Sequence, residues 1–239
     1  MPQVDAQAIQ SRLGQVRETL RQACLRNGRQ VELMAVSKTF PAEAVAAAAD
    51  VGQRVFGENY AQEGCAKVEE LRALRPDLNL VWHFIGPLQA NKTRMVAQAF
   101  DWVDSVDRVR IAQRLNDQRP PEMAPLNVLI EVNIDAEQSK SGVSPDELVS
   151  LVEAVQKMPR LRLRGLMTIP APAEGYEEQM KPLAAMKKLF DALAPRYGFD
   201  TLSMGMSADM VTAVDAGSSM VRVGSAIFGA RHYPNREQG

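Results

Sequence analysis

The segment that decides the fold is residues 31–52, VELMAVSKTFPAEAVAAAADVG. Its first part, residues 31–37, is a short apolar run typical of a buried strand. A turn follows, and then an alanine-rich stretch, residues 41–50, that opens with proline and closes before a glycine, which predicts a helix with a small-faced surface. The segment therefore predicts a strand that a helix connects to the next strand, as parallel strands require.

The same unit recurs along the chain without evident sequence identity between its copies. The predicted strands are residues 31–37, 54–57, 80–85, 102–105, 126–133, 161–169, 201–204 and 220–223. Alternation of strands and helices over 239 residues predicts an α/β fold, a parallel sheet closed into a (β/α)8 TIM barrel. An open doubly wound sheet is the alternative. No linker divides the chain, so residues 1–239 are expected to form one domain, and the proline-rich residues 169–173 are expected to form a loop at a barrel end.

Two helices have specific signals. Before the first strand, an apolar stripe recurs at helical spacing in Ile9, Leu13, Val16 and Leu20, which predicts an extra N-terminal helix packed on the barrel's outside. Residues 144–147, Ser-Pro-Asp-Glu, read as an N-cap, a first-turn proline and a capping-box glutamate, so a helix is expected to begin there.

Composition excludes several functional classes. Hydrophobic residues make up 46% of the chain and charged residues 24%, as in ordinary globular proteins. A net charge of -1 provides no positive field for nucleic acid or an anionic membrane. The uncharged stretches are too short to cross a bilayer, and the polar amino terminus is unlike a signal peptide, so a cytoplasmic location is expected.

Cysteine and histidine are scarce. The two cysteines, Cys24 and Cys65, form no disulfide framework and are expected to be free, partly buried thiols. The two histidines, His83 and His232, are far from both cysteines in sequence, so no metal site is expected.

Reactive groups in such a barrel lie at the carboxyl ends of the strands. The first predicted strand runs directly into Lys38, which places an amine at the barrel mouth. Partial burial favours the neutral form of a lysine, and the neutral amine forms Schiff bases with aldehydes. The alternative is a lysine that snorkels to the rim.

The last two strands carry the other candidates. Residues 203–207 and residues 224–229 offer backbone N–H groups after the seventh and eighth strands, where these barrels often bind phosphate, although two ordinary glycine turns would look the same. Arg222 lies within the last strand and needs a partner, either a carboxylate such as Glu131 or an acceptor on a bound ligand. Beside a pyridine nitrogen, an arginine would leave that nitrogen unprotonated. A lysine, a phosphate loop and an arginine at one barrel end together suggest pyridoxal 5'-phosphate.

Six ordered motifs closely resemble the pyridoxal phosphate homeostasis (YggS) family, and the resemblance covers nearly the whole chain. They are residues 35–39 AVSKT, 56–60 FGENY, 82–92 WHFIGPLQANK, 164–167 RGLM, 203–207 SMGMS and 221–229 VRVGSAIFG. The family implies a single-domain barrel like the N-terminal domain of alanine racemase. It also implies a role for individual residues: Lys38 as the Schiff-base lysine, Arg222 at the pyridine nitrogen, Ser207, Gly224 and Ser225 at the phosphate, and Asn59 and Ser203 lining the pocket.

The function that this resemblance implies is intracellular homeostasis of pyridoxal phosphate: the protein holds the cofactor and buffers or supplies it, with apo-enzymes as possible recipients, as a monomer or weak dimer. It is not expected to be an enzyme. The alternative is an amino-acid racemase, which needs a second acid–base group opposite Lys38. Alanine racemase takes that group from a second domain, and this chain ends soon after the barrel; Tyr60 and His83 are the candidate substitutes. A barrel enzyme acting on another phosphorylated aldehyde is a third class.

Lys140 follows the fifth predicted strand and could overhang the mouth. We hypothesise an electrostatic or transient aldehyde contact during cofactor loading, against the alternative of a solvated loop lysine.

Overall fold

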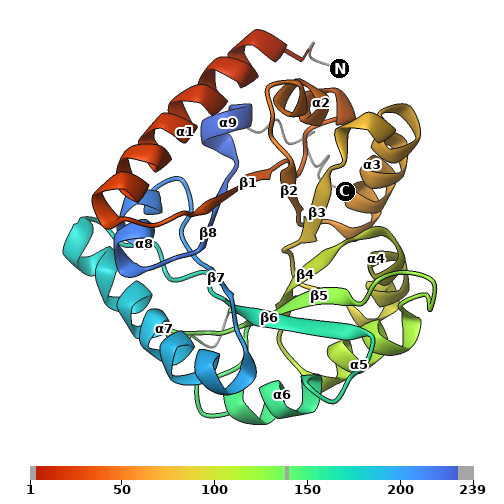
Figure 1. The fold of residues 1–239 in the computed structure, drawn as a ribbon, viewed down its shortest axis with the longest axis vertical. Helices are drawn as coiled ribbons and strands as arrows, with labels where there is room; N and C mark the ends of the chain where they lie inside the picture. Colours follow the sequence, from red (N-terminus) through yellow and green to blue (C-terminus); the bar gives the residue numbers. More distant parts are fainter. Residues whose placement is uncertain (1–3, 138–139, 231–239) are drawn as a thin grey trace, which may run out of the picture.

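The computed structural model describes residues 4–137 and 140–230. Within these ranges, eight parallel strands follow one another around a closed barrel, and β1 pairs with both β2 and β8 (Figure 1). The strands are β1 (Glu32–Val36), β2 (Val55–Glu58), β3 (Val81–Phe84), β4 (Trp102–Val106), β5 (Leu126–Glu131), β6 (Leu161–Met167), β7 (Thr201–Ser203) and β8 (Met220–Val223). The predicted TIM barrel is therefore confirmed, each strand end lies within two residues of its prediction, and the open sheet is wrong.

Helices surround the barrel (Figure 1). They are α1 (Ala6–Asn27), α2 (Ala42–Asp50), α3 (Ala61–Leu74), α4 (Thr93–Ala99), α5 (Val109–Gln118), α6 (Leu148–Val155), α7 (Tyr176–Tyr197), α8 (Met210–Ala216) and α9 (Ser225–Phe228), with the short 3-10 helices η1 (Pro76–Leu78) and η2 (Ala90–Lys92). In the described ranges, none of them combines the length and the apolar character that a membrane crossing requires.

The predicted N-terminal helix is α1, which packs against α2, α8 and α9. Its stripe of Ile9, Leu13, Val16 and Leu20 is buried, as predicted. The helix ends at Gly28, whose φ of 59° is the left-handed conformation in which a helix commonly terminates. An additional helix thus covers the outside of the barrel beside the junction of its first and last strands.

The helix expected at residues 144–147 begins later, at Leu148, and residues 145–147 form a turn. The preceding chain is held extended at the end of β5, because the Val143 N–H donates to the Glu131 carbonyl (2.8 Å). The Ser144 hydroxyl accepts from the Glu147 N–H (3.3 Å), which is the predicted N-cap half of a capping box, but the Glu147 carboxylate accepts from that hydroxyl (2.8 Å) and not from the Ser144 N–H.

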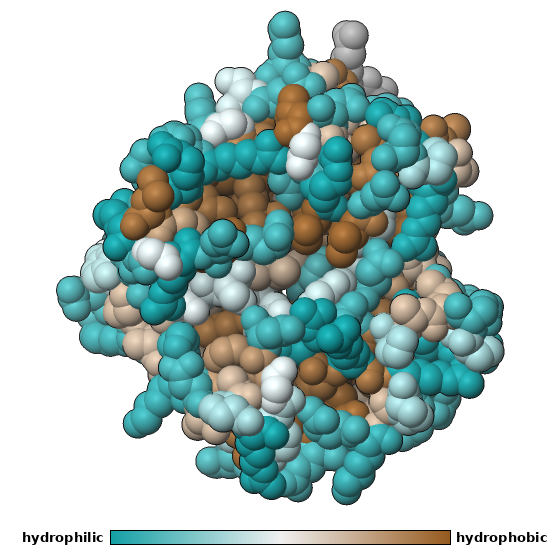
Figure 2. All heavy atoms as spheres, in the orientation of Figure 1, coloured by the Kyte–Doolittle hydropathy of each residue, from teal (hydrophilic) through white to brown (hydrophobic). Residues whose placement is uncertain are grey.

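Side chains of successive strand residues point to opposite faces of the barrel wall. In β1, Leu33 and Ala35 join the large apolar core beneath the helices, whereas Met34 and Val36 belong to a separate small cluster inside the barrel. On the face drawn in Figure 2, hydrophilic side chains form most of the surface and hydrophobic ones gather in its hollows. By the same alternation, Arg222 in β8 faces the barrel interior, since Val221 and Val223 belong to the outer core.

Candidate functional site

The predicted site residues lie on four neighbouring strands. Lys38 follows β1, Asn59 follows β2, Ser203 ends β7, and Arg222 lies in β8, and these strands are consecutive around the barrel because β8 pairs with β1. All strands are parallel, so their carboxyl ends open on one mouth. The structure therefore brings residues from both ends of the chain to one arc of the mouth.

Lys38 lies in a tight turn over residues 37–40. The turn is closed by a hydrogen bond from the Phe40 N–H to the Ser37 carbonyl (3.1 Å), which places Lys38 and Thr39 at its centre. Thr39 has a φ of 69°, the left-handed value that the third residue of a type II turn requires and that usually calls for glycine. A β-branched residue in this conformation costs roughly 1–3 kcal/mol, so the surrounding contacts must hold the turn.

Arg222 is buried, at 3% exposure, and its hydrogen-bond partners do not include Glu131, the carboxylate given as one of its two alternative partners. Its guanidinium donates to Ser203 Oγ (2.7 Å) and to the Thr168 carbonyl (2.8 Å), and no ion pair joins it to any carboxylate of the described residues. Burial lowers its pKa, although the charges of Asp104, Asp209 and Glu131 oppose this effect. The Nε–H donates to no acceptor among the residues that the structure describes, so the guanidinium keeps a donor for a ligand.

Glu131, the carboxylate proposed as the partner of Arg222, ends β5 and is 7% exposed. Burial and the charge of Asp107 raise the pKa of Glu131 to about 7, while Arg222 lowers it by a smaller amount. The interaction between Glu131 and Arg222 is therefore a charge effect across the barrel, and the carboxyl titrates near neutral pH.

The loops after β7 and β8 differ in the hydrogen bonding of their N–H groups. Ser207 and Ser225 are exposed, and Gly224 is buried at the start of α9. The Met206 N–H donates to Asp209 Oδ1 (2.6 Å) and is not free. In contrast, the N–H groups of Ser225 and Ala226 donate to no acceptor within the described residues.

Asn59 also has an unused hydrogen-bonding atom. Its Oδ1 atom is buried and has no hydrogen-bond partner in the described part of the chain. Buried polar atoms are nearly always paired, and an orphan of this kind marks a place where a ligand or water binds. The unpaired N–H groups of the β8 loop are donors that fit a small anion, whereas Asn59 Oδ1 is an acceptor that fits a hydroxyl or N–H group of a ligand or a water.

Tyr60 and His83, the candidates for a second acid–base group, lie in different surroundings. Tyr60 caps α3 and is 48% exposed. His83 is buried inside the barrel, where its Nδ1 lies 2.9 Å from Asp104 Oδ1 and its ring stacks on Trp102. Neither Tyr60 nor His83 has a hydrogen bond or ring contact that would place it beside Lys38 in the described residues.

Lys140 is engaged by its own loop. Its Nζ lies 3.1 Å from Asp135 Oδ2 and 3.3 Å from Glu137 Oε2, and it also donates to the Ile169 carbonyl (3.4 Å). These contacts place Lys140 beside the loop that follows β6.

Sequence reasoning missed Glu58, Glu63 and Lys67. Lys67 occupies the buried stripe of α3 together with Gly64, Val68 and Leu71, at spacings of three, one and three. A lysine within an apolar stripe signals a buried ion pair, and Glu63 four residues earlier was the available partner. The contacts of this cluster are described with the further inference.

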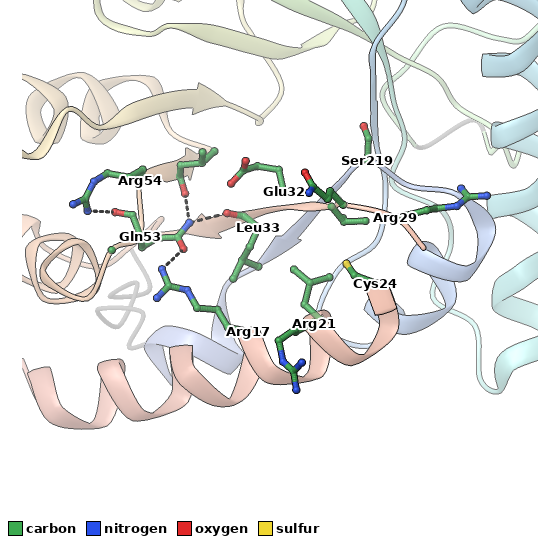
Figure 3. Close-up of a pocket in the computed structure, with 14 residues that line it drawn as sticks. Arg17, Arg21, Cys24, Arg29, Glu32, Leu33, Gln53, Arg54 and Ser219 are labelled. Atoms are coloured by element: carbon green, nitrogen blue, oxygen red, sulfur yellow. Dashed lines mark hydrogen bonds between the residues drawn. The ribbon is translucent and has the colours of Figure 1, made fainter. Parts of the chain in front are cut away.

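A cavity of about 830 Å³ lies at the end of the barrel opposite to Lys38, where β1 and β2 begin (Figure 3). It contains none of the predicted site residues. Three of its four arginines are engaged by the protein, since Arg17 donates to Gln53 Oε1 (3.2 Å), Arg54 to the Ala49 carbonyl (2.6 Å) and Arg21 to Glu18. They do not converge on one point, so we assign no ligand to this cavity.

Comparison with known proteins gives a consistent result. Residues 4–232 match the family "Alanine racemase, N-terminal domain". The chain is 54% identical over 232 residues to the pyridoxal phosphate homeostasis protein of Escherichia coli (strain K12), covering 95% of this chain and 99% of the relative. It is 50% identical to the Pseudomonas aeruginosa protein of that name, covering 94% of this chain and 96% of the relative.

Solved structures agree with the sequence comparisons. PipY of Synechococcus elongatus, solved with PLP bound, is 32% identical and superposes with a TM-score of 0.79, covering 92% of this chain and 100% of that one. Alanine racemase from Corynebacterium glutamicum is only 19% identical, with a TM-score of 0.71 over 99% of this chain and 64% of that chain, which is a likeness of fold.

Proposed function

This chain belongs to the pyridoxal phosphate homeostasis protein family, and from that premise we propose that it holds and releases pyridoxal 5'-phosphate, bound as a Schiff base to Lys38. One observation carries the proposal. The turn with Lys38 adjoins β8, whose interior face bears Arg222 and whose following loop has two unpaired N–H groups. An amine, a guanidinium and anion donors are the groups that this cofactor requires.

Each residue has a proposed role. The neutral amine of Lys38 adds to the aldehyde carbon, and loss of water, made from the aldehyde oxygen and two amine protons, leaves a C=N bond. Ser207, Gly224 and Ser225 hold the phosphate, and Asn59 and Ser203 line the pocket. Addition of water reverses the reaction, so the cofactor is stored reversibly.

Arg222 is proposed to face the pyridine nitrogen. The cofactor supplies electron-sink chemistry when its ring nitrogen is protonated, and an arginine does not give up a proton to it. Arg222 is also fixed by two hydrogen bonds, to Ser203 and Thr168, so it is preorganised. This arrangement suits a carrier better than a catalyst.

We propose that the chain is not a racemase. The relatives are named as homeostasis proteins. A racemase needs a second acid–base group on the face of the substrate opposite the lysine. Among the described residues, Tyr60 is half exposed as the cap of α3, and His83 is buried and bonded to Asp104, which argues against either serving as that group.

The proposed recipients of the cofactor are apo-enzymes, and the proposed state is a monomer or weak dimer. The proposed location is the cytoplasm, which agrees with Cys24 and Cys65 being free thiols. Direct handover predicts that an apo-enzyme gains cofactor faster from this protein than from the free pool at matched concentration. If the apo-enzyme gains cofactor at the same rate from both sources, the protein acts only as a passive buffer of the cofactor.

The test is a visible absorption spectrum of the protein mixed with pyridoxal phosphate, followed by borohydride reduction and peptide mapping. We expect a Schiff-base band and a label on Lys38, both lost in Lys38→Ala. Lys188→Ala, which removes an exposed lysine of α7, is the matched control. A protein that gains no band, or a label on another side chain, would overturn the proposal.

A further inference from the structure

An ionic cluster with a buried lysine and one buried and one partly exposed glutamate contacts the turn that carries Lys38. Lys67 of α3 is 5% exposed, and its Nζ lies 2.6 Å from Glu58 Oε1, 3.1 Å from Glu63 Oε1 and 2.9 Å from the Ser37 carbonyl. An ammonium has three donors, and all three are used. We call Glu58, Glu63 and Lys67 the α3 ionic cluster.

The cluster holds the Lys38 turn at both sides of the lysine. Before it, the Ser37 hydroxyl donates to Glu58 Oε1 (2.6 Å), while the Ser37 carbonyl accepts from Lys67 (2.9 Å). After it, the N–H of Thr39 donates to Glu63 Oε1 (2.6 Å). Thr39 is the residue with the left-handed φ of 69°, so the strained residue is the one that the cluster binds.

Stability alone does not account for the cluster. A buried ion pair is often no more stabilising than apolar side chains of the same size. Lys67 occupies the apolar stripe of α3, where a leucine or methionine would pack against Val68 and Leu71. Glu58 Oε2 is buried without a partner among the described residues, and burial raises the pKa of this carboxyl. Because the burial of these charged groups is unfavourable, the cluster has a role other than stability, and its contacts with the turn supply one.

We propose that Lys67 is a positioning residue, which holds the turn over residues 37–40 through Glu58 and Glu63 and thereby directs the Lys38 amine to the barrel mouth for condensation with pyridoxal phosphate. This inference rests on the proposed function for its ligand. The covalent step is unchanged: the Lys38 nitrogen forms the C=N bond and one water leaves. The cluster affects only the fraction of time that the Lys38 amine points toward the barrel mouth, where this step takes place.

The first test alters the contact with Thr39. Glu63→Ala removes the acceptor, Glu63→Gln keeps a side-chain carbonyl that accepts the same hydrogen bond, and Glu70→Ala removes an exposed glutamate of the same helix as a control. In Glu63→Ala we expect about tenfold slower Schiff-base formation, the order of one lost hydrogen bond to a charged group. Glu63→Gln is expected to recover most of the rate, and Glu70→Ala to match the wild type.

A second readout needs no cofactor. Amide hydrogen exchange of the peptide containing residues 37–40 should be faster in Glu63→Ala than in Glu63→Gln or Glu70→Ala, because the Thr39 N–H loses its acceptor. A wild type that takes up no pyridoxal phosphate would overturn the proposed function, yet this exchange still decides whether the cluster holds the turn. Equal exchange and equal rates in all variants would overturn the inference.

Lys67 itself is tested in a variant designed to fold. Lys67→Met alone would leave Glu58 buried and unpaired, so it is combined with Glu58→Gln, which keeps an acceptor for the Ser37 hydroxyl. We expect this double variant to unfold cooperatively, to exchange the amide hydrogens of residues 37–40 faster than the wild type, and to form the Schiff base about tenfold more slowly. A folded double variant with wild-type exchange and rate would refute the role of Lys67. If the double variant fails to fold, the Glu63 variants described above decide whether the cluster holds the turn.

Discussion

Glu131→Gln is expected to remove a pH dependence from the stability of this protein. Glu131 is 7% exposed, and its pKa is raised from 4.5 to about 7, first by burial and then by Asp107. The folded protein therefore keeps this proton up to about pH 7, whereas the unfolded chain releases it near its ordinary value. The stability that the protonated carboxyl contributes is present in full below pH 4.5 and is lost as pH rises through 7.

The magnitude follows from the two pKa values. The difference between 4.5 and about 7, at about 1.4 kcal/mol per pKa unit, corresponds to about 3 kcal/mol of unfolding free energy. Glutamine is neutral throughout this range, so the variant has no such loss. Any fixed cost of placing an amide there is the same at both pH values and cancels when each protein is compared with itself.

The assay is urea unfolding followed by tryptophan fluorescence at about pH 5 and pH 8, the two sides of the expected transition. The wild type should lose more stability than Glu131→Gln between these values, by about 2 to 3 kcal/mol. Glu122→Gln, at an exposed glutamate, is the matched control and should behave as the wild type. An identical pH dependence in the wild type and in Glu131→Gln would refute the assignment of this titration to Glu131.

Three further predictions follow from the site. Gly86→Ala would place a Cβ 2.1 Å from the Asn59 carbonyl oxygen, so the backbone must move. We expect the unfolding free energy, measured in denaturant, to fall by about 3 kcal/mol and cofactor binding to weaken. Unchanged stability and binding would contradict the close approach of Gly86 to the Asn59 backbone. Arg222→Met leaves the Ser203 hydroxyl without its donor, and about 2 to 4 kcal/mol of stability should be lost together with cofactor affinity, measured by unfolding and by spectroscopic titration. Lys140→Ala is expected to slow cofactor loading in stopped-flow absorbance, and loading and release at wild-type rates would end the hypothesis of a transient contact.

The strand pattern was sufficient to predict the barrel. Each strand is a short apolar run bounded by turn residues, and the helices between such runs leave parallel closure as the main solution. The start of α6 was placed about three residues early because residues 145–147 form a separate turn before the helix, and the Ser-Pro-Asp-Glu pattern does not distinguish such a turn from a first helical turn. Local patterns thus predicted the elements but not all of their exact ends.

The site was predicted less completely than the fold. The position of Lys38 after the first strand followed from the sequence, but the hydrogen bond from Lys67 to the neighbouring Ser37 carbonyl did not, because that contact depends on which face of α3 lies against the turn. The partner of Arg222 was left open between Glu131 and a ligand; the structure gives it hydrogen bonds to Ser203 and Thr168 in place of Glu131, and the contact with a ligand stays a prediction. Such hydrogen bonds join side chains on different strands, and the spacing of residues along the sequence does not predict them.

The pairing of β1 with β8 has a consequence for how the protein is made. Lys38 is synthesised early, whereas its neighbour across this seam, the strand with Arg222, comes near the end of the described chain. Contacts between segments so far apart in sequence form late and slowly in folding. Under the proposed binding mode, a ribosome-bound nascent chain would carry the Lys38 amine for most of its elongation without the strand that bears Arg222, and cofactor capture is expected only after that last strand has been synthesised.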